Sequence, residues 1–240
     1  MKTHIRQFIA GLLLTLLVTS CACPRMKSSK DSVNLLKPEL LYTFLTGMGV
    51  DSDPDKVFQW KNGNLHISGQ HYGYIATKGD YSNYVLVAEY KYGDKTWAPR
   101  LNNARDSGIL CHFVGRDHVW PKSIEAQIIE GGSGDILVVS GAKLTIDGVT
   151  KGPRIERFDR PGRSPWKDVK GFVGPNEVEK PHGQWNTMKI LCDRDIFGVW
   201  VNDHKTLIGS NAVPQAGKIL VQSEGAEMIF RRLELQPIKN

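Results

Sequence analysis

Apolar and polar residues alternate with a period of two through most of the sequence from about residue 40 onward. The longest such run is YVLVAEYKY, at residues 84–92. Runs of this kind, bounded by Gly, Pro and Asn, predict β-strands joined by turns. No segment has helical periodicity over more than two turns, which excludes a coiled coil. The predicted strands are residues 64–68, 84–92, 107–114, 123–130, 135–140, 187–192, 198–201, 218–222 and 228–235.

The turn residues support the same fold class. The chain of 240 residues contains 24 Gly and 12 Pro, and Asn202-Asp203 separates two short apolar runs in the manner of a hairpin turn. With 40% hydrophobic residues and no internal repeat, the chain can bury one substantial core. Many short strands linked by turns predict an all-β protein, a two-sheet sandwich or jelly roll.

The first twenty residues have the features of an export signal. Lys2 and Arg6 precede an apolar run, residues 8–18, that is too short for a stable membrane-spanning helix. The run ends in VTSC, which resembles the bacterial lipobox, where cleavage leaves a lipidated Cys21 as the new N-terminus. The alternative is an ordinary signal peptide followed by a chance Cys.

These features predict the organisation of the chain. We expect a lipoprotein signal peptide at 1–20, a polar tether at 21–37 and a single domain at 38–240. The predicted location is the bacterial cell envelope, on its periplasmic or outer-membrane face. We expect the protein to be attached to the membrane through the lipid on Cys21.

The charge pattern argues against a nucleic-acid partner. Together, 31 Lys and Arg against 25 Asp and Glu give a net charge of +6, which signal cleavage would lower to about +4. The basic residues form no stripe interleaved with aromatic residues. Cys111 and Cys192 lie in predicted strands, where we expect buried free thiols, with a disulfide as the alternative.

Residues 151–183 interrupt the strand pattern. This segment contains five prolines and no alternation. A loop this long without secondary structure of its own is usually functional or disordered. We expect an ordered rim or lid over a binding face.

Residues 123–130 are the most informative candidate for a site. On a strand, Glu125 and Gln127 point to one face, while Ile and Ala side chains point to the other. A polar pair backed by an apolar row predicts a strand that lines a cleft, with a solvated outer face as the alternative. A one-residue bulge at 128–129 would return Glu130 to the face of Glu125.

Two residues near the preceding strand extend this candidate site. His112 follows Leu110 on one strand face, so we expect His112 beside Glu125. Arg105 leads into the same strand and is expected to clamp a substrate oxygen. A structural pair between Arg105 and Asp106 is the alternative.

Several aromatic side chains favour a carbohydrate ligand. Sugar rings present C–H faces that stack on indole and phenol planes, and their hydroxyls need polar partners such as Gln127 and Asn186. The chain has no phosphate-binding loop, no GxGxxG and no GxSxG motif. The candidate sugar-binding aromatics are Tyr72, Trp97, Trp120 and Trp185.

The order and spacing of several motifs resemble one known family. Over about residues 42–238 the chain is similar to the 3-keto-disaccharide hydrolase domain family. The resemblance implies a concanavalin A-like lectin/glucanase sandwich in a secreted or lipid-anchored bacterial protein. The matching motifs are Asp106-Ser107-Gly108-Ile109, Glu125-x-Gln127-Ile128, Gly183-Gln184-Trp185-Asn186, Val201-Asn202, GKILVQSEG at 217–225 and Phe230-Arg231-Arg232-Leu233.

A second resemblance competes with the first. Glu125-x-Gln127-x-x-Glu130 is similar to the Glu-x-Asp-x-x-Glu signature of β-glucanases that share this sandwich. In those enzymes the two Glu are nucleophile and acid/base. Gln127 replaces the central Asp here, which argues against a standard retaining mechanism.

The first resemblance implies a hydrolase of 3-keto-glycosides. Because a ketone at C3 acidifies the hydrogen on C2, we expect the reaction to proceed by C2 proton abstraction, elimination and hydration. Glu125 is the expected base, and Arg105 or His112 would stabilise the enolate. Glu130 or His112 would protonate the leaving group. No cofactor is expected; a divalent metal is an alternative enolate stabiliser, but no ligand set is evident. A retaining β-glycosidase and a non-catalytic carbohydrate-binding module are the alternative functions.

Overall fold

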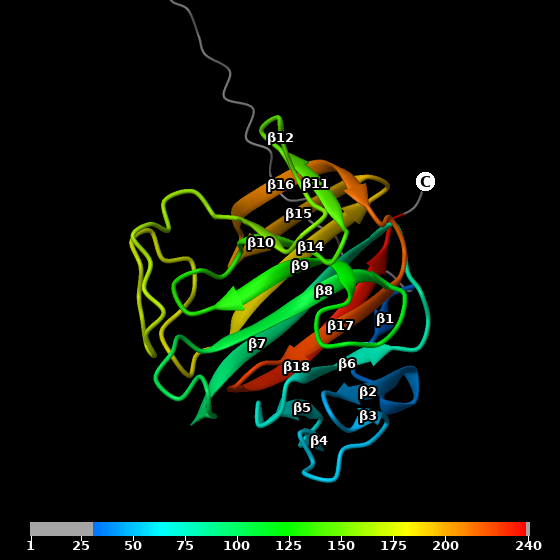
Figure 1. Ribbon diagram of the computed structural model, residues 1–240, viewed down its shortest axis with the longest axis vertical. Coiled ribbons are helices and arrows are strands. Elements are labelled where there is room, and N and C mark those ends of the chain that lie inside the picture. The colour runs from blue at the N-terminus through cyan, green and yellow to red at the C-terminus, as the bar shows by residue number, and fades with distance from the viewer. Residues whose placement is uncertain (1–30, 239–240) are drawn as a thin grey trace, which may run out of the picture.

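The structure is a computed structural model that describes residues 31–238, and these form two β-sheets stacked face to face (Figure 1). The sheet nearer the viewer, called the front sheet, has eight strands in the order β13-β10-β9-β8-β17-β6-β2-β3. The back sheet has ten strands, nine in the order β12-β11-β16-β15-β14-β7-β18-β5-β4, with β1 paired to β18. The only helical element in the described residues is a 3-10 turn, Pro38–Leu40. The predicted all-β, two-sheet jelly-roll sandwich is confirmed.

The strands of the two sheets alternate along the chain. The front sheet comprises β2 (Leu41–Leu45), β3 (Gly49–Val50), β6 (Gly73–Thr77), β8 (Asp106–Val114), β9 (Lys122–Ile129), β10 (Ile136–Val139), β13 (Glu156–Phe158) and β17 (Lys218–Ser223). The back sheet comprises β1 (Val33–Asn34), β4 (Phe58–Lys61), β5 (Asn64–Ile67), β7 (Tyr84–Thr96), β11 (Lys143–Ile146), β12 (Val149–Lys151), β14 (Asn186–Asp193), β15 (Ile196–Val201), β16 (His204–Val213) and β18 (Ala226–Pro237). Neighbouring strands pair antiparallel throughout.

One apolar core fills the space between the sheets. Ile109 and Ile124 of the front sheet pack in it with Leu86, Ile190 and Phe230 of the back sheet, and all five are fully buried. Successive residues of a strand point to opposite faces. The residues between these core positions therefore point away from the core, and those of the front sheet form its outer face.

The predicted hairpin is confirmed at Asn202-Asp203. Both residues have positive φ, 48° and 67°, and they join β15 to β16. Two such residues are what a two-residue hairpin turn requires. Each predicted strand overlaps a strand of the structure, and β16 was predicted only as the short run after the hairpin turn. The strands that were not predicted are β1, β2, β3, β4, β6, β11, β12 and β13.

The predicted tether boundary at residue 37 is wrong. Val33–Asn34 forms β1, which pairs with β18, and Leu35 and Leu36 are buried in the core. The two leucines lie in a polar stretch too short to show a period. The predicted signal peptide and Cys21 lie outside the described residues, and no helix in residues 31–238 is long and apolar enough to cross a membrane.

The segment after β13 lies at one end of the sandwich, on the left in Figure 1. It is attached there through Asp135, which is fully buried. Arg163 Nε lies 2.8 Å from Asp135 Oδ2, and the backbone N of Arg160 donates to Asp135 Oδ1 at 2.6 Å. The segment is thus ordered by hydrogen bonds, but most of it covers the end of the sheets rather than the outer face of the front sheet.

Candidate active site

A pocket of about 280 Å³ opens on the outer face of the front sheet, where β8, β9, β10 and the end of β17 meet. One part of its wall is apolar, and the other part is polar and charged. The apolar residues are Trp120, Leu137, Val139 and Ile155, and the polar residues are Asp106, Glu125, Gln127, Arg157, Gln222 and Glu224.

The strand register explains how these side chains come together. Glu125 on β9 lies opposite Leu137 on β10, and Leu137 lies opposite Arg157 on β13. Gln127 lies opposite Gly108 on β8. Glu125 and Gln127 are each only 3% exposed. The predicted cleft-lining face is confirmed, and the alternative of a solvated face is wrong.

Three carboxyl groups share this pocket, and all three hold protons more tightly than usual. Burial raises the pKa of Glu125 to about 8, assisted by the charge of Asp106 and opposed by Arg157. Burial, and then the charge of Glu125, raises the pKa of Glu224 to about 8. Burial and the charge of Glu224 also raise the pKa of Asp106 well above its usual range. Like charges in a dry site cannot all ionise together, so this cluster retains protons near neutral pH.

Hydrogen bonds fix part of this cluster and leave part of it without partners. Gln127 Nε2 donates to Asp106 Oδ1 at 2.8 Å, and Arg100 Nη2 lies 3.2 Å from Asp106 Oδ2. The buried Oε1 atoms of Gln127 and Gln222 have no hydrogen-bond donor. Buried acceptors are normally paired, so unpaired ones that line a pocket are suited to the hydroxyl donors of a ligand.

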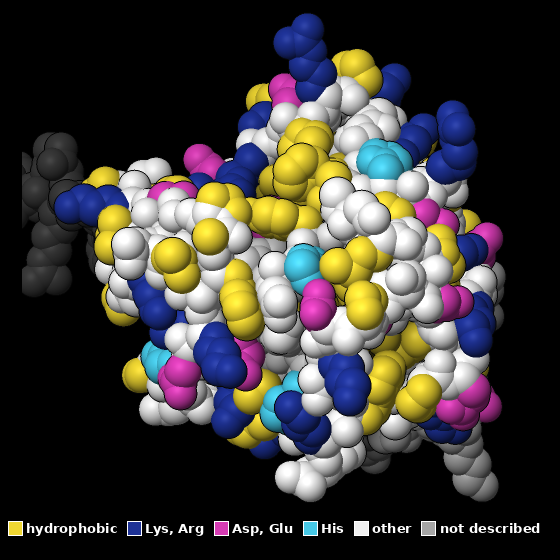
Figure 2. Space-filling model, turned by 60° about the horizontal axis from the view of Figure 1, so that its bottom comes forward, with side chains coloured by type: hydrophobic (Ala, Val, Ile, Leu, Met, Phe, Trp, Pro, Cys, Tyr) yellow, Lys and Arg dark blue, Asp and Glu magenta, His cyan; other side chains and the backbone are white. Residues whose placement is uncertain are grey.

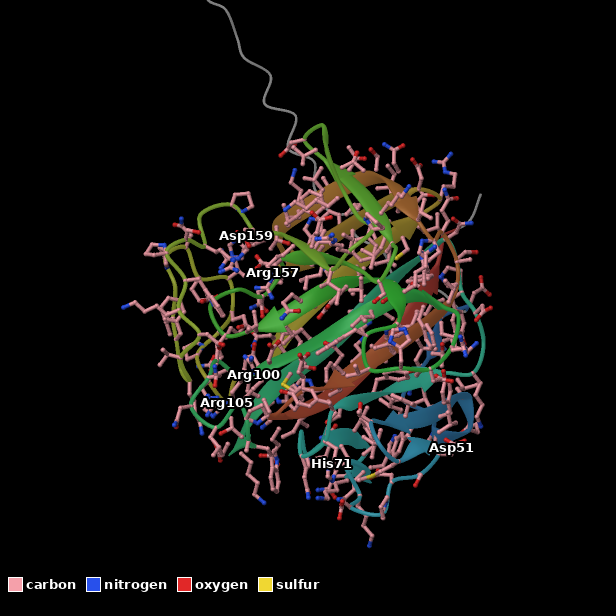
Figure 3. All side chains as sticks on the ribbon, in the orientation of Figure 1. Asp51, His71, Arg100, Arg105, Arg157 and Asp159 are labelled. Atoms are coloured by element: carbon pink, nitrogen blue, oxygen red, sulfur yellow. The ribbon has the colours of Figure 1, made fainter. Side chains whose placement is uncertain are left out.

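The basic groups approach the pocket from two sides. Figure 3 shows Arg157 beside β10 on one side of β9, and Arg100 near the start of β8 on the other side. Arg157 lines the pocket itself, whereas Arg100 contacts Asp106 and also Asp168 Oδ1, at 3.1 Å. Arg157 is therefore the guanidinium that a ligand in the pocket can contact.

A loop anchored to the front sheet positions Trp120. Asp117 Oδ1 accepts hydrogen bonds from Tyr42 Oη at 2.7 Å and Tyr74 Oη at 2.6 Å. Ser140 Oγ donates to the carbonyl of Trp120 at 2.7 Å. In Figure 1 this loop, between β8 and β9, crosses in front of β17. It covers a second apolar cluster, formed by Tyr74, Ala76, Leu110, Phe113, Val139 and Leu220.

Glu130 and Arg105 lie together outside this pocket. Arg105 Nη1 lies 2.5 Å from Glu130 Oε1, and the backbone N atoms of Arg105 and Gly171 donate to Glu130 Oε2. The predicted bulge at 128–129 is absent, because the pairing of β8 with β9 is regular from Asp106 to Cys111. Glu130 therefore does not return to the face of Glu125.

The structure places His112 on the core side of the front sheet, so its predicted position beside Glu125 is wrong. The β8–β9 register shifts between Cys111 and Val114, and His112 itself has a φ of 59°. Its ring packs edge-on against Tyr84, and its Nδ1 lies 3.1 Å from the carbonyl of Pro214. Burial lowers the pKa of His112.

The predicted sugar-binding residues separate into two groups. Trp120 lines the pocket. Tyr72 lies near it, since burial and then the charge of Glu224 raise the pKa of Tyr72. Trp97, Trp185 and Asn186 do not line the pocket.

Each of those three residues has a structural contact elsewhere. The Trp97 indole N–H donates to the carbonyl of Ser68 at 2.8 Å. Trp185 lies under the guanidinium of Arg231, whose Cζ is 4.4 Å from the ring centroid. Asn186 Oδ1 accepts hydrogen bonds from the backbone N of Lys180 and from Asn202 Nδ2, both at 2.8 Å.

Sequence reasoning missed four residues of the site: Arg100, Arg157, Gln222 and Glu224. Gln222 and Glu224 do carry a signal, because they alternate with the core residue Val221 as Glu125 and Gln127 alternate with core positions on β9. Arg157 follows Pro153 in an irregular segment, where no periodicity indicates its face. Cys111 and Cys192 are free and buried, as expected.

Residues 31–238 contain no group of three or more His, Cys, Asp or Glu arranged to hold a metal ion. A depression of about 440 Å³ on the outer face of the back sheet is larger than the pocket. Four of its five charged residues form ion pairs, Lys189 with Asp203 and Arg232 with Glu89, and the fifth is Lys180. The front-sheet pocket differs in combining buried carboxyl groups with unpaired acceptors.

A carboxyl-lined pocket on the outer face of a two-sheet sandwich suits a glycosyl hydrolase-like or carbohydrate-binding protein, and comparison with known sequences supports this class. Residues 45–236 match the family described as the 3-keto-alpha-glucoside-1,2-lyase-like domain, and the chain belongs to that family. A comparison with curated proteins finds no match.

Solved structures share the fold at low sequence identity. Two crystal structures from Parabacteroides distasonis, each named a putative glycosyl hydrolase, give TM-scores of 0.53 and 0.54 at 17% and 16% identity. Both similarities cover 87% of this chain, and they cover 100% and 94% of the other proteins. LamAcat from Zobellia galactanivorans gives a TM-score of 0.52 at 9% identity, over 85% of this chain and 96% of LamAcat. These similarities show the common sandwich.

Proposed function

We propose that this protein cleaves the glycosidic bond of 3-keto-glycosides by elimination followed by hydration. The observation that carries the proposal is the position of Glu125, a buried carboxyl in a pocket whose neighbouring glutamine acceptors are unpaired. Family membership supports the substrate class. The burial and electrostatics of the pocket support the chemistry.

The reaction begins at the carbon next to the ketone. A ketone at C3 acidifies the hydrogen on C2, and the ionised form of Glu125 removes that proton. The electron pair of the broken C–H bond forms an enolate with the ketone. Arg157, which is separated from Glu125 by Leu137 across the sheet, stabilises the enolate oxygen. The enolate then expels the group at C1, which leaves with a proton from Glu224. Water adds across the resulting double bond, with hydroxyl at C1 and hydrogen at C2.

The carboxyl cluster supports both proton transfers at one pH. A pKa of about 8 makes Glu125 a stronger base than an ordinary carboxylate, and it makes Glu224 an acid that still carries its proton near neutral pH. Asp106 orients Gln127 by accepting a hydrogen bond from its side chain, and Arg100 in turn contacts Asp106. The acid and the enolate stabiliser proposed here differ from the sequence-based expectation, which named Glu130, His112 and Arg105.

A retaining mechanism is disfavoured by the contacts of Glu130. That mechanism needs two carboxyl groups on either side of the scissile bond. Glu130 instead pairs with Arg105 and accepts a backbone hydrogen bond from Gly171 at 2.7 Å. Glu125 thus lacks the partner that the glucanase-like signature would supply.

The test combines an isotope experiment with a variant. Turnover of a 3-keto-glucoside in heavy water is expected to place deuterium at C2 of the product, after correction for exchange measured on the product alone. Glu125→Gln is expected to fold normally, to bind sugar and to lose at least about a hundredfold in rate, the usual contribution of a general base. Glu39→Gln, an exposed change outside the pocket, is the matched control.

Three results would count against the proposal. A product without deuterium at C2 excludes the elimination route. Full activity of Glu125→Gln excludes this residue as the base. Sugar binding without turnover of either the 3-keto-glucoside or its parent would indicate a carbohydrate-binding module.

We extend the proposal to the location of the protein. Lipidation of Cys21 at the VTSC sequence would hold the domain at the bacterial cell envelope, in reach of sugars that enter it. Cys21→Ser is expected to abolish lipidation and to remove the chain from the membrane fraction. Normal acylation of this variant would instead point to Cys23 or exclude the lipobox.

A further inference from the structure

Two buried glutamine oxygens in the pocket take no part in the proton transfers of the proposed reaction. Gln127 is 3% exposed and Gln222 is 2% exposed, and the Oε1 atom of each lacks a hydrogen-bond donor. A buried acceptor without a donor is destabilising, so two of them in one pocket indicate a ligand that supplies donors. Figure 2 shows apolar, basic and acidic side chains interspersed on the face that it presents, which indicates no particular partner there.

The two glutamines lie on either side of Gly108, which has no side chain. Gln127 of β9 lies directly opposite Gly108 of β8. Gln222 belongs to β17, which pairs with the other edge of β8. A Cβ atom on Gly108 would collide with the Oε1 atoms of both Glu125 and Gln222. An oxygen of the proposed base and an unpaired amide oxygen are therefore close together, over the same bare position of the sheet.

The proposed reaction places one carbon of the substrate at this position. C2 loses its proton to Glu125, and C2 also carries a hydroxyl group. The C–H and C–O bonds of a tetrahedral carbon point in different directions, so when the hydrogen faces Glu125 the hydroxyl faces a neighbour of Glu125. Gln222 Oε1 is such a neighbour, and it is an acceptor that a hydroxyl donor can satisfy.

The other groups of the proposed reaction agree with this placement. C1 and C3 are both bonded to C2 and lie on opposite sides of it. Arg157, which stabilises the oxygen on C3, lies on the β13 side of Glu125, beyond Leu137. Glu224, which protonates the group that leaves C1, follows β17 and lies on the side of Gln222. The C2 hydroxyl and the oxygen that leaves C1 are on adjacent carbons, so both can face the end of β17.

We propose that Gln222 is a specificity-determining residue whose Oε1 atom accepts a hydrogen bond from the C2 hydroxyl of the sugar. The proposal rests on the proposed function, since it takes Glu125 as the residue that faces the C2 hydrogen. It limits the substrates to glycosides with a free hydroxyl at C2, and the family description as glucoside-specific supports the configuration of glucose at that carbon. The C2 epimer, mannose, exchanges the hydrogen and the hydroxyl, and a 2-deoxy sugar leaves Gln222 Oε1 buried and unpaired.

Binding of unreactive glycosides tests this proposal separately from catalysis. Calorimetric titrations would compare methyl glucoside, methyl 2-deoxyglucoside and methyl mannoside, all of one anomeric configuration and none oxidised at C3. Without the ketone, the hydrogen on C2 is not acidic and no elimination occurs. The glucoside is expected to bind at least about fivefold more tightly than each of the other two, because only the glucoside brings a donor to Gln222.

Variants connect the preference to Gln222. Gln222→Met removes the acceptor at similar side-chain length, and its affinities for the three glycosides are expected to lie within about twofold of one another. A purely structural role of Gln222 would instead weaken binding of all three equally and leave their ratios unchanged. Gln222→Asn, which withdraws the amide by one CH2 group, is a second variant and is expected to lower the ratios as well.

A buried glutamine elsewhere provides the matched control. Gln236 is 5% exposed and lies on β18, outside the pocket. Gln236→Met therefore makes the same chemical change away from the proposed sugar site. This variant is expected to retain the wild-type affinity ratios.

Several outcomes would overturn the proposal. They are equal affinities of the wild type for the three glycosides, tightest binding of the mannoside or the 2-deoxyglucoside, no binding of any of them, or wild-type ratios in both Gln222 variants. Failure of the proposed function has a different signature, namely a 3-keto-glucoside product without deuterium at C2. That result leaves the affinity ratios as they are, so the two failures are distinguishable.

Discussion

Gly108 lies directly beneath Glu125 on the outer face of the front sheet. A Cβ atom at Gly108 would overlap with Oε1 of Glu125 and would lie 2.5 Å from Oε1 of Gln222. Gly108 has an ordinary strand conformation, so its role comes from the space it leaves rather than from backbone freedom. The absence of a side chain here lets the Glu125 and Gln222 side chains lie across β8.

Gly108→Ala is therefore expected to damage the site more than the fold. The added methyl group pushes Glu125 and Gln222 out of position, and a displacement of about 1 Å can cost about a hundredfold in rate. We expect at least a tenfold loss of kcat/KM on a 3-keto-glucoside, with a change in unfolding free energy below about 2 kcal/mol. Gly79→Ala is the control, since no atom lies within 3.8 Å of its added Cβ. Equal activity of the two variants would contradict the arrangement described for Glu125.

The Asp117 anchor predicts an effect on both stability and binding. Asp117→Ala leaves the hydroxyls of Tyr42 and Tyr74 without their acceptor, and Tyr74 is fully buried. We expect a loss of about 1–3 kcal/mol of unfolding free energy in urea, together with weaker binding of a 3-keto-glucoside, because the loop that carries Trp120 keeps only the Ser140 hydrogen bond. Tyr42→Phe removes one of the two hydrogen bonds and is expected to have a smaller effect. Unchanged stability and binding in Asp117→Ala would show that the loop needs no anchor.

The alternating pattern was sufficient to predict the sandwich and the face of Glu125 and Gln127. Period-two alternation records which side of a strand is buried, and that information is local. The position of His112 depends instead on a bulge set by the pairing of β8 with its neighbours β9 and β17. Since one inserted residue reverses every later side chain, a local pattern cannot predict where His112 points.

The other missed residues depend on contacts between distant segments. Arg157 reaches the pocket because β13 pairs with β10, and Asp117 is an anchor because β2 and β6 bring two tyrosine hydroxyls to it. Glu224 follows β17, which pairs between β6 and β8. The spacing of residues in the sequence does not indicate which strands pair. The sequence therefore predicted Glu125 as the base, but not the residues that surround it.

The Arg105–Glu130 pair predicts a structural rather than a chemical role. Both side chains are buried, at 8% and 7% exposure, so removing one charge leaves the other without its partner. Arg105→Met is expected to cost about 3–5 kcal/mol of unfolding free energy. The double variant Arg105→Met, Glu130→Gln is expected to recover part of that loss and to retain activity. A folded double variant without activity would instead indicate that Arg105 and Glu130 take part in catalysis.

The raised pKa of Glu125 predicts how stability depends on pH. Its pKa is about 8 in the folded protein against 4.5 as the ordinary value, so between these limits the folded state holds a proton that the unfolded chain has released. Stability must then fall as pH rises through this window, by up to about 1.4 kcal/mol per pH unit for one such group. Glu224 and Glu179, both with pKa values of about 8, act in the same direction. The lowered pKa of His112 acts in the opposite direction, because His112 releases its proton at a lower pH in the folded protein than in the unfolded chain.

Comparing variants isolates the contribution of Glu125 from these other groups. Urea unfolding of the wild type at several pH values from 5 to 8 is expected to show decreasing stability, and Glu125→Gln is expected to show a shallower decrease. The substitution removes the titration of Glu125 and also the charge that is the second cause of the shift at Glu224. Glu39→Gln, exposed and outside the pocket, is expected to retain the wild-type slope. If Glu125→Gln has the wild-type slope as well, then Glu125 ionises normally in the folded protein and is not the high-pKa base of the pocket.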